Sequence, residues 1–317
     1  MKDAPVVILH NPIAGSGRAS RLASALASSL ETLGIPSIQE PTRRAGDGVR
    51  IASEWEEKCR LLFVVGGDGT IREVLQGLSR FQTPLATLPA GTSNVLAMEL
   101  GLPRSPGEAA LLVREGALTH LDVMELHRKD TAPLRSLLFT GAGFDAQVVH
   151  RVARARRKSL ESGGRGNITK FSYVLPAFQA LARIPEPSLR VYLDGSPLGG
   201  GPFGWVLVTN IASFGGLFHL GPGIHPGDGI LDVLALPAAT PLQVLRYGLA
   251  GFLRVLHKVK GLVRAQAKKE VRIEGKGKIP VQVDGDEGGD IPLTVLRLKE
   301  RVPFLVPPKG REKEGSR

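Results

Sequence analysis

Short apolar runs alternate along the first 120 residues with longer segments whose apolar positions recur at helical spacing. The runs Val6–Leu9, Leu61–Val65 and Leu85–Leu88 have the length and β-branched content of strands buried on both faces. The segments Ala19–Leu33 and Ile71–Leu78 have the 3.6-residue period of amphipathic helices. The same pattern predicts further strands at Ser37–Glu40 and Leu118–Leu126, and helices at Asp47–Glu57, Val95–Leu100 and Glu108–Glu115. This alternation predicts a doubly wound, Rossmann-like α/β domain with a parallel sheet.

From about residue 125 the pattern changes to short strands separated by Gly and Pro, which predicts an antiparallel, sandwich-like β domain. The expected strands are Leu137–Thr140, Leu189–Leu193, Trp205–Asn210, Ile230–Leu236, Val271–Ile273, Val281–Val283 and Val295–Leu298. We therefore expect two domains, one of residues 1–124 with the returning segment 303–317, and one of residues 125–302.

One longer helix is expected in the second half, over Pro241–Lys269. Its apolar stripe consists of Leu242, Leu245, Leu249, Phe252 and Leu256, flanked by Arg and Lys. Such a stripe usually packs on its own domain, but the basic flanks also suit anionic lipid head groups. A second basic run, Arg151–Lys158, precedes a glycine-rich stretch.

Charge is unevenly distributed over the 317 residues. Residues 1–122 carry a net charge of −1 and residues 123–317 carry +12. A basic half suggests an anionic partner, either a membrane surface or nucleic acid. Only 5% of the residues are aromatic and no RNA-binding signature is present, so we do not expect nucleic acid as a partner. Solubility is the simpler explanation and stays open.

Cysteine use and the N-terminus indicate the compartment. Cys59 is the single cysteine, so no disulfide framework exists and a reducing compartment is expected. The apolar run at Val6–Leu9 is too short for a signal peptide, and Asn11-Pro12 follows it directly. We expect a soluble, cytoplasmic protein.

The sequence Gly66-Gly67-Asp68-Gly69-Thr70 joins a predicted strand to a predicted helix. Glycines allow backbone N–H groups to approach an anion, and the helix dipole favours it, so this turn predicts a phosphate site. Asp68 would repel a phosphate unless it meets a metal or a hydroxyl, which points to a nucleotide with Mg²⁺. The alternative is a plain turn with Asp68 as the N-cap of the helix.

Two other loops of small polar residues, Asn11–Gly17 and Pro89–Asn94, also follow predicted strands. Loops at the carboxyl ends of parallel strands converge on one crevice. Asn11, Asp68, Thr70 and Thr92 are therefore expected around one nucleotide. A dinucleotide fingerprint is disfavoured, because Ser20 stands where its third glycine belongs.

The three loops, NPIAGSG, GGDGT and PAGTSNVLA, resemble the diacylglycerol kinase catalytic-domain family in motif, order and spacing. That family contains bacterial lipid kinases and the sphingosine kinases, and further matches run to Asp286. The resemblance implies an ATP-dependent lipid kinase whose first domain binds ATP, whose second domain binds the lipid, and whose active site lies in the cleft. GGDGT alone is shared with NAD kinases.

By the same resemblance, the ATP-binding residues are carried over from the motifs and from a threonine after the second strand. They are Asn11, Pro12, Ala14, Gly15, Ser16, Gly17, Thr42, Gly66, Gly67, Asp68, Gly69, Thr70, Gly91, Thr92, Ser93 and Asn94. One departure concerns Val95, because some members carry an Asp linked to Mg²⁺ at that position. The metal shell is therefore expected to differ, or the chain belongs to another subgroup.

Two further segments suggest metal sites. Asp122 is an acid in an apolar strand, and the resemblance implies a place near the cleft. Because a half-buried carboxylate is costly without a partner, we expect it to hold a metal through water or to contact the substrate, with a salt-bridged boundary residue as the alternative. The segment from Ile224 to Asp232 resembles the family's structural Mg²⁺ loop, which implies the Asp228 carboxylate and the carbonyls of His225 and Ile230 as ligands. Without the resemblance, Asp228-Gly229 is an ordinary hairpin turn.

The last motif, VQVDGDE, places Asp284 and Asp286 on either side of a glycine after a strand. The resemblance implies Asp286 as the general base, since the family carries Glu or Asp there. Asp reaches one methylene less far than Glu, so Glu287 stays open as a substitute. Asp284 would orient the site or hold a metal-bound water. An acidic hairpin turn is the alternative, since Asp-Gly is a common turn sequence.

Together these features predict an ATP- and Mg²⁺-dependent kinase for a lipid alcohol such as diacylglycerol, peripheral on the inner face of the membrane. A sphingoid-base or ceramide kinase is the close alternative, followed by an NAD kinase and a non-catalytic lipid-binding regulatory protein. The sequence leaves a homodimer open.

Overall fold

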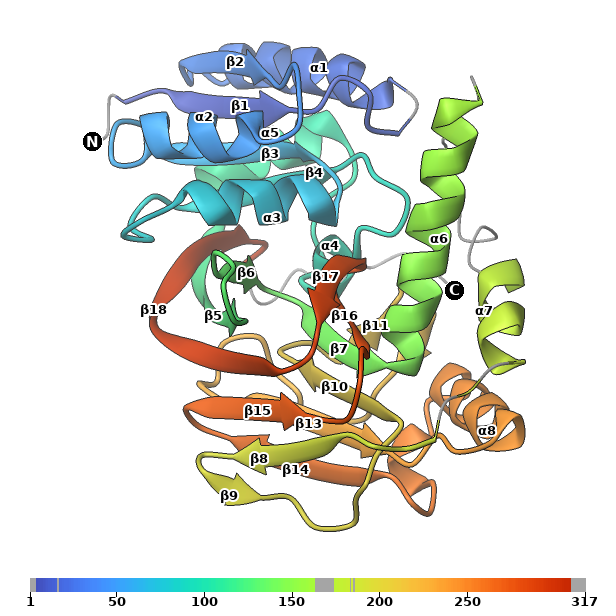
Figure 1. The fold of residues 1–317 in the computed structure, drawn as a ribbon. Helices are drawn as coiled ribbons and strands as arrows, with labels where there is room; N and C mark the ends of the chain where they lie inside the picture. The colour runs from blue at the N-terminus through green and yellow to red at the C-terminus, as the bar shows by residue number, and fades with distance from the viewer. Residues whose placement is uncertain (1–3, 16, 163–173, 183, 185, 309–317) are drawn as a thin grey trace. The chain divides into compact units, whose positions relative to one another are not determined.

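The computed structural model describes residues 4–15, 17–162, 174–182, 184 and 186–308. The chain divides into two compact units, one of Met1–Leu121 with Glu300–Arg317 and one of Asp122–Lys299 (Figure 1). The first is an α/β unit and the second is built mainly of antiparallel strands, so the expected fold class is confirmed.

The first unit contains a parallel sheet in the order β2-β1-β3-β4. Its strands are β1 (Val6–His10), β2 (Ser37–Pro41), β3 (Leu61–Gly66) and β4 (Leu85–Pro89), and Phe304 of β18 (Leu293–Val306) pairs with Leu85. Its helices are α1 (Arg18–Thr32), α2 (Asp47–Trp55), α3 (Asp68–Gly77), α4 (Val95–Glu99) and α5 (Pro106–Glu115).

Helices cover both faces of this sheet. Helices α1 and α5 pack together on one face, and α2 and α3 pack together on the other (Figure 1). Every residue of β1, β3 and β4 is buried as a result, which explains why these strands read as continuous apolar runs without alternation. The expected doubly wound arrangement follows from this burial.

In the second unit, an antiparallel sheet has the order β14-β13-β10-β7-β16-β17. A second group pairs β18 with β15, β15 with β8 and β8 with β9, and β5 pairs with β6. The bounds are β5 (Ala117–His127), β6 (Leu134–Ser136), β7 (Phe139–Gly143), β8 (Arg190–Leu193), β9 (Ser196–Pro197), β10 (Trp205–Thr209), β11 (Ser213–Phe214), β12 (Phe218–His219), β13 (Leu231–Leu236), β14 (Val263–Ala267), β15 (Glu270–Glu274), β16 (Pro280–Val283) and β17 (Asp286–Asp290).

The core of the second unit joins these two groups of strands. Val206 and Val233 from the first sheet share one buried cluster with Val191, Val271 and Val295 from the second group. This is the expected sandwich arrangement, in which two inner faces form a common core.

The described residues of the second unit include the α-helices α6 (Phe144–Glu161), α7 (Val174–Leu181) and α8 (Pro241–Phe252). Helix α6, which carries the basic run Arg151–Lys158, was not predicted from the sequence. In the described part of the chain, no helix is long and apolar enough to cross a membrane.

The expected helix over Pro241–Lys269 is wrong in length. Helix α8 ends at Phe252, a 3-10 turn follows at Leu256–Lys258, and Val263–Ala267 is a strand. Arg254 adopts a left-handed conformation with φ of 60°, which ends the helix. The apolar stripe was read as continuous because Leu256 fits its period, but Leu256 is buried while the other four residues of the stripe are exposed.

Candidate active site

Three loops of the first unit meet at the carboxyl ends of its parallel strands. The backbone N–H of Asn11 donates to the carbonyl of Val65 at 3.4 Å, and that of Ala90 donates to Gly66 at 2.8 Å. The segments Asn11–Gly17, Gly66–Thr70 and Pro89–Asn94 thus lie next to one another, as the strand order predicts.

Glycine is required where these loops touch. A Cβ on Gly15, whose φ is +58°, would lie 2.2 Å from the carbonyl oxygen of Ala90. A Cβ on Gly91 would lie 2.7 Å from the Cα of Gly67. No side chain fits at either contact, so the backbones of the three loops pack directly against each other.

Asp68 connects two of the loops. Its carboxylate accepts the backbone N–H groups of Val95 at 2.9 Å and Leu96 at 3.2 Å, which satisfies the first turn of α4. Gly67, not Asp68, is the N-cap of α3. Asp68 therefore caps the neighbouring helix, and the idea that it caps its own is wrong. Val95 is buried, and its hydrocarbon side chain offers no oxygen ligand at this position.

The remaining predicted ATP-binding residues are distributed over the same loops. Asn94 adopts φ of 49° and closes its loop by two amide hydrogen bonds to Gly91, at 2.9 and 2.7 Å. Thr42 follows β2 and lies beside the last residue of β1, because its N–H donates to the backbone carbonyl of His10 at 2.9 Å. Thr70 is buried in the first turn of α3, whereas Thr92 is exposed. Ser16 lies outside the described residues.

Asp47 was not singled out by the sequence analysis. Its buried carboxylate accepts the N–H groups of Arg43 at 2.7 Å and Arg44 at 3.1 Å, directly after Thr42. These two hydrogen bonds, the one from Arg43 foremost, hold the pKa of Asp47 below its usual range. The signal that could have found it is an Asp at a helix start, preceded by basic residues.

In the second unit, the acidic motif forms the turn of the β16–β17 hairpin. Asp284 and Gly285 have φ of 50° and 87°, as in a type I′ turn. The carboxylate of Asp284 accepts the Ser136 hydroxyl at 2.6 Å and the Phe139 N–H at 3.1 Å, which fixes the turn to neighbouring strands. Asp286 is exposed at the first residue of β17. The two acids thus have different environments: Asp284 is anchored and Asp286 faces solvent.

Glu287 has a different partner. Its carboxylate accepts two hydrogen bonds from the guanidinium of Arg157 on α6, and His150 Nδ1 lies 3.8 Å away. The hydrogen bond from Arg157 holds the pKa of Glu287 below its usual range. The lowered pKa makes Glu287 a weaker base, and Arg157 engages both of its carboxylate oxygens. Both features argue against Glu287 as the proton acceptor.

Two buried residues, Gln282 and Asp145, support the Asp284–Gly285 turn through hydrogen bonds. Gln282 donates from Nε2 to the Asp145 carboxylate at 3.0 Å and accepts the Gly285 N–H on Oε1 at 3.0 Å. Burial raises the pKa of Asp145 to about 7. Neither Gln282 nor Asp145 was given a role of its own from the sequence, in which an Asp that follows a buried strand was the available signal.

The predicted metal loop lies within the second unit. Asp228 accepts the Ile230 N–H at 3.0 Å, and Asp122 accepts the Gly229 N–H at 2.6 Å. Asp232 is buried nearby, and its pKa is raised by burial and then by the charge of Asp228. Its Oδ2 has no hydrogen-bond partner among the described residues.

This carboxylate environment fits a hard cation, which would relieve the repulsion between Asp228 and Asp232. Within the residues that the structure describes, no cluster of three or more His, Cys, Asp or Glu side chains could hold a metal. Any cation here would therefore depend on backbone carbonyls and water, in line with the expected roles of His225 and Ile230, which stay predictions.

Comparison with known proteins gives matches along nearly the whole chain. Residues 5–126 match the model of the diacylglycerol kinase catalytic domain, and residues 139–307 match the YegS C-terminal NAD kinase beta sandwich-like domain. A diacylglycerol kinase of Mycobacterium tuberculosis is 27% identical over 307 residues, covering 96% of both chains. Another from Bacillus subtilis is 24% identical over 309 residues, covering 96% of this chain and 97% of the relative.

Solved structures share the fold. A diacylglycerol kinase from Bacillus anthracis superposes with a TM-score of 0.70 at 20% identity, covering 97% of this chain and 98% of that one. A second crystal structure from the same organism gives a TM-score of 0.78 at 22% identity, with 97% of each chain covered. Both domain models match in order and account for most of the sequence, so the chain belongs to the diacylglycerol kinase catalytic-domain family.

Proposed function

We propose that this protein is an ATP- and Mg²⁺-dependent lipid kinase that phosphorylates the hydroxyl of a neutral glycerolipid such as diacylglycerol. The observation that carries the proposal is the convergence of three glycine-containing loops at the carboxyl ends of β1, β3 and β4, in a chain whose relatives are named diacylglycerol kinases. Residues 1–124 with 303–317 would form the ATP-binding domain, and residues 125–302 the lipid domain.

The loops of the first unit would bind the nucleotide phosphates through backbone N–H groups at the starts of α1 and α3. When bound, Mg²⁺ would neutralise the developing charge on the transferred phosphoryl group. Asp68 lies within the Gly66–Thr70 loop itself, and its hydrogen bonds to α4 keep its carboxylate in one orientation.

Asp286 would act on the lipid. Its carboxylate would accept the proton of the lipid hydroxyl as that oxygen attacks the γ-phosphorus, the bond to the β-phosphate oxygen breaks, and ADP leaves. Exposure of Asp286 at the hairpin turn leaves it accessible to a substrate hydroxyl, and the anchored Asp284 fixes the turn that presents it.

Other acceptors remain as rival proposals. A sphingoid base or ceramide would use the same chemistry. The match of the second unit to a domain described as NAD kinase-like favours NAD as the next acceptor. Buried Val95, in place of an acid, favours a non-catalytic lipid-binding protein.

The location that we propose is cytoplasmic and peripheral on the inner face of the membrane. The support is the charge of +12 on residues 123–317, which suits an anionic surface. A homodimer remains compatible with this proposal.

The proposal is tested by transfer of label from γ-labelled ATP with Mg²⁺ to separate lipids in anionic mixed micelles. The acceptors are diacylglycerol, monoacylglycerol, phosphatidylglycerol, sphingosine and ceramide, with NAD as a control. We expect labelled phosphate on diacylglycerol, reduced at least about a hundredfold by Asp286→Asn because the proton acceptor is lost.

Glu287→Gln is the matched control, since it removes a neighbouring carboxylate that is already engaged with Arg157. It should keep activity within about threefold of the unmodified protein. Formation of labelled NADP would identify the protein as an NAD kinase. Binding of ATP without any labelled product would identify a non-catalytic protein instead.

A further inference from the structure

Helix α8 turns its Leu and Phe side chains to solvent. Ten large apolar side chains are exposed in the described part of the chain, and half of them belong to α8 and its C-cap residue, with exposed fractions of 53% to 76%. These are Leu242, Leu245, Leu249, Phe252 and Leu253. Of the remaining five, four lie singly in the first unit. The fifth, Leu217, precedes Phe218, whose side chain lies against Gly251 of α8.

The five exposed side chains form one face. At 100° per residue they fall within an arc of about 100° on the helix surface. The opposite face carries the buried residues Val244, Tyr247, Ala250 and Gly251. Val244 packs with Phe144, Ala180 and Ala238 in a small cluster of the second unit. Helix α8 is therefore held by the face that carries Val244 and Tyr247, while its Leu and Phe side chains form a continuous apolar face of the kind that marks an interaction site.

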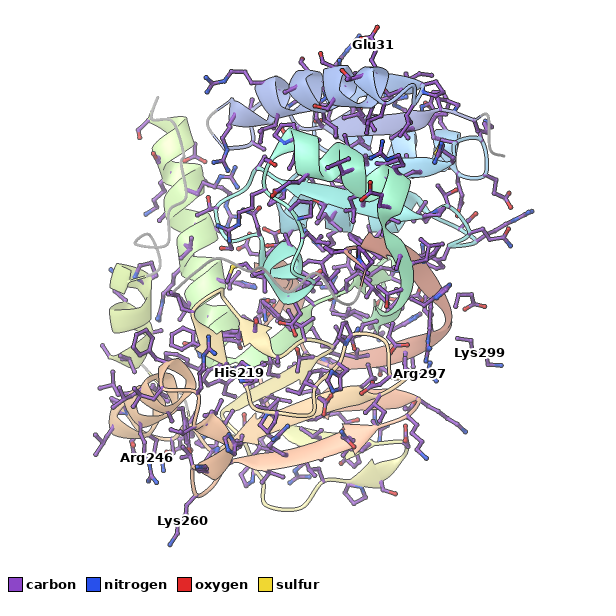
Figure 2. All side chains as sticks on the ribbon, turned by 180° about the vertical axis from the view of Figure 1, so that it is seen from behind. Glu31, His219, Arg246, Lys260, Arg297 and Lys299 are labelled. Atoms are coloured by element: carbon purple, nitrogen blue, oxygen red, sulfur yellow. The ribbon has the colours of Figure 1, made fainter. Side chains whose placement is uncertain are left out.

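Basic residues accompany this apolar face, on α8 itself and in the segment that follows it. Residues 233–269 contain seven Lys or Arg residues and no Asp or Glu. Arg246 on α8 and Arg254, Lys258 and Lys260 just after it are all exposed. The side chains of Arg246 and Lys260 project outward near α8 (Figure 2).

We infer that this surface docks on an anionic lipid bilayer. The α8 patch, as we call it, consists of the five exposed apolar residues together with Arg246, Arg254, Lys258 and Lys260. The apolar side chains would enter the boundary between head groups and acyl chains, and the four cations would meet lipid phosphates. The inference rests on the proposed function, because a kinase for a membrane lipid must reach its acceptor at a bilayer surface.

Other occupants fit the patch less well. Nucleic acid would pair with the cations but leave the Leu and Phe side chains in water, which removes the reason for their exposure. A second copy of this chain, joined through a twofold axis, would place the same four cations against each other. A bilayer with anionic head groups satisfies both the apolar face and the charge.

The test is co-sedimentation of the full chain with large vesicles, without ATP. We expect binding to mixed phosphatidylglycerol and phosphatidylcholine vesicles and weak binding to phosphatidylcholine alone. Leu245→Ser/Leu249→Ser should weaken the first by at least about tenfold, because two apolar side chains are lost from the interface. Arg246→Glu/Lys258→Glu should weaken it about tenfold and flatten its salt dependence.

The matched control is Ile38→Ser/Leu118→Ser, which removes two exposed apolar side chains from the first unit. This variant should sediment with vesicles like the unmodified protein. If both α8 variants also bind unchanged, the inference is overturned. Gel filtration without lipid tests the alternative of a second copy. If the unmodified protein is a dimer, the α8 variants are monomers and vesicle binding is unchanged, the apolar face serves self-association and the inference is wrong.

A parallel kinase assay separates this inference from the proposed function. A short-chain diacylglycerol dissolved below its micelle concentration should be phosphorylated at the same rate by the α8 variants and the unmodified protein. The variants should lose rate only on vesicle substrate. Vesicle binding that requires the patch, in a protein that phosphorylates neither substrate, would refute the proposed function. Phosphorylation with vesicle binding independent of the patch would refute the inference alone.

Discussion

The side-chain amide of Gln282 links the buried carboxyl group of Asp145 to the turn that carries Asp284 and Asp286. Its Nε2 lies 3.0 Å from Asp145 Oδ2, and its Oε1 lies 3.0 Å from the N–H of Gly285. Gln282 is 1% exposed. The position of the proposed base thus depends on a buried hydrogen bond of β16, the strand next to the edge strand β17.

Replacement of this amide should slow catalysis more than it disturbs nucleotide binding. For Gln282→Leu we expect kcat to fall about tenfold to a hundredfold, because the turn loses its buried anchor, while KM for ATP stays unchanged. The free energy of unfolding should fall by about 1–3 kcal/mol, since Asp145 and Gly285 each lose a hydrogen-bond partner. Steady-state kinetics and thermal melting measure the two effects.

Thr140→Val is the control for this prediction. The Thr140 hydroxyl, on β7, donates to the backbone carbonyl of Gln282 at 2.7 Å. The variant therefore removes a buried hydrogen bond to β16 but leaves the hydrogen bond between the Gln282 side chain and Gly285 intact. It should lower the melting temperature with little change in kcat. An equal loss of kcat in both variants would show that general destabilisation, not the turn, controls the rate.

Asp145 should make the stability of the protein depend on pH. Burial raises the pKa of the Asp145 carboxyl in the folded protein to about 7, above its ordinary value of 3.8, so the stability that its protonated form contributes is complete below pH 3.8. That contribution is lost as pH rises toward 7, on the order of 4 kcal/mol in total. Asp145→Asn cannot titrate and should be more stable than the unmodified protein at pH 8 and similar at pH 4. Melting curves of both proteins that run parallel from pH 4 to pH 8 would contradict this.

Asp68 is expected to have separable structural and functional effects. Asp68→Ala should destabilise the protein by about 1–2 kcal/mol, because α4 loses two capping hydrogen bonds. Asp68→Asn keeps an amide oxygen for one of them and should melt closer to the unmodified protein. Under the proposed function, both variants should lose phosphoryl transfer. Retained transfer in Asp68→Asn would limit this residue to capping.

Two glycines of the first loop should differ in their tolerance of alanine. Gly15→Ala places a Cβ 2.2 Å from the Ala90 carbonyl oxygen, so the Pro89–Asn94 loop must shift and ATP affinity should fall at least about tenfold. At Gly17 nothing lies within 4 Å of the added Cβ, and Gly17→Ala should cost only the strain of its φ of +88°, about 1 kcal/mol of stability. Calorimetric titration with ATP compares them; equal affinities would show that the loop contact is not needed for binding.

The alternation of buried runs and helical periods was sufficient to predict the two-unit fold. Continuous apolar strands such as β3 occur where helices cover both faces of a sheet, and this burial is visible in the sequence as the absence of alternation. The convergence of the three loops at one edge was also predictable, since parallel strands end at the same edge of their sheet. The roles of the individual site residues stay predictions.

Tertiary structure decided how single side chains are used. Asp68 caps α4, twenty-seven residues along the chain, and Glu287 pairs with Arg157 on a helix that the sequence analysis did not identify. Helix α8 presents its most apolar stripe to solvent, although its period alone predicted a stripe packed on its own domain. Periodicity records which residues share a face, but not whether that face meets protein, water or lipid. That outcome depends on contacts between segments far apart in the chain, which a local pattern does not contain.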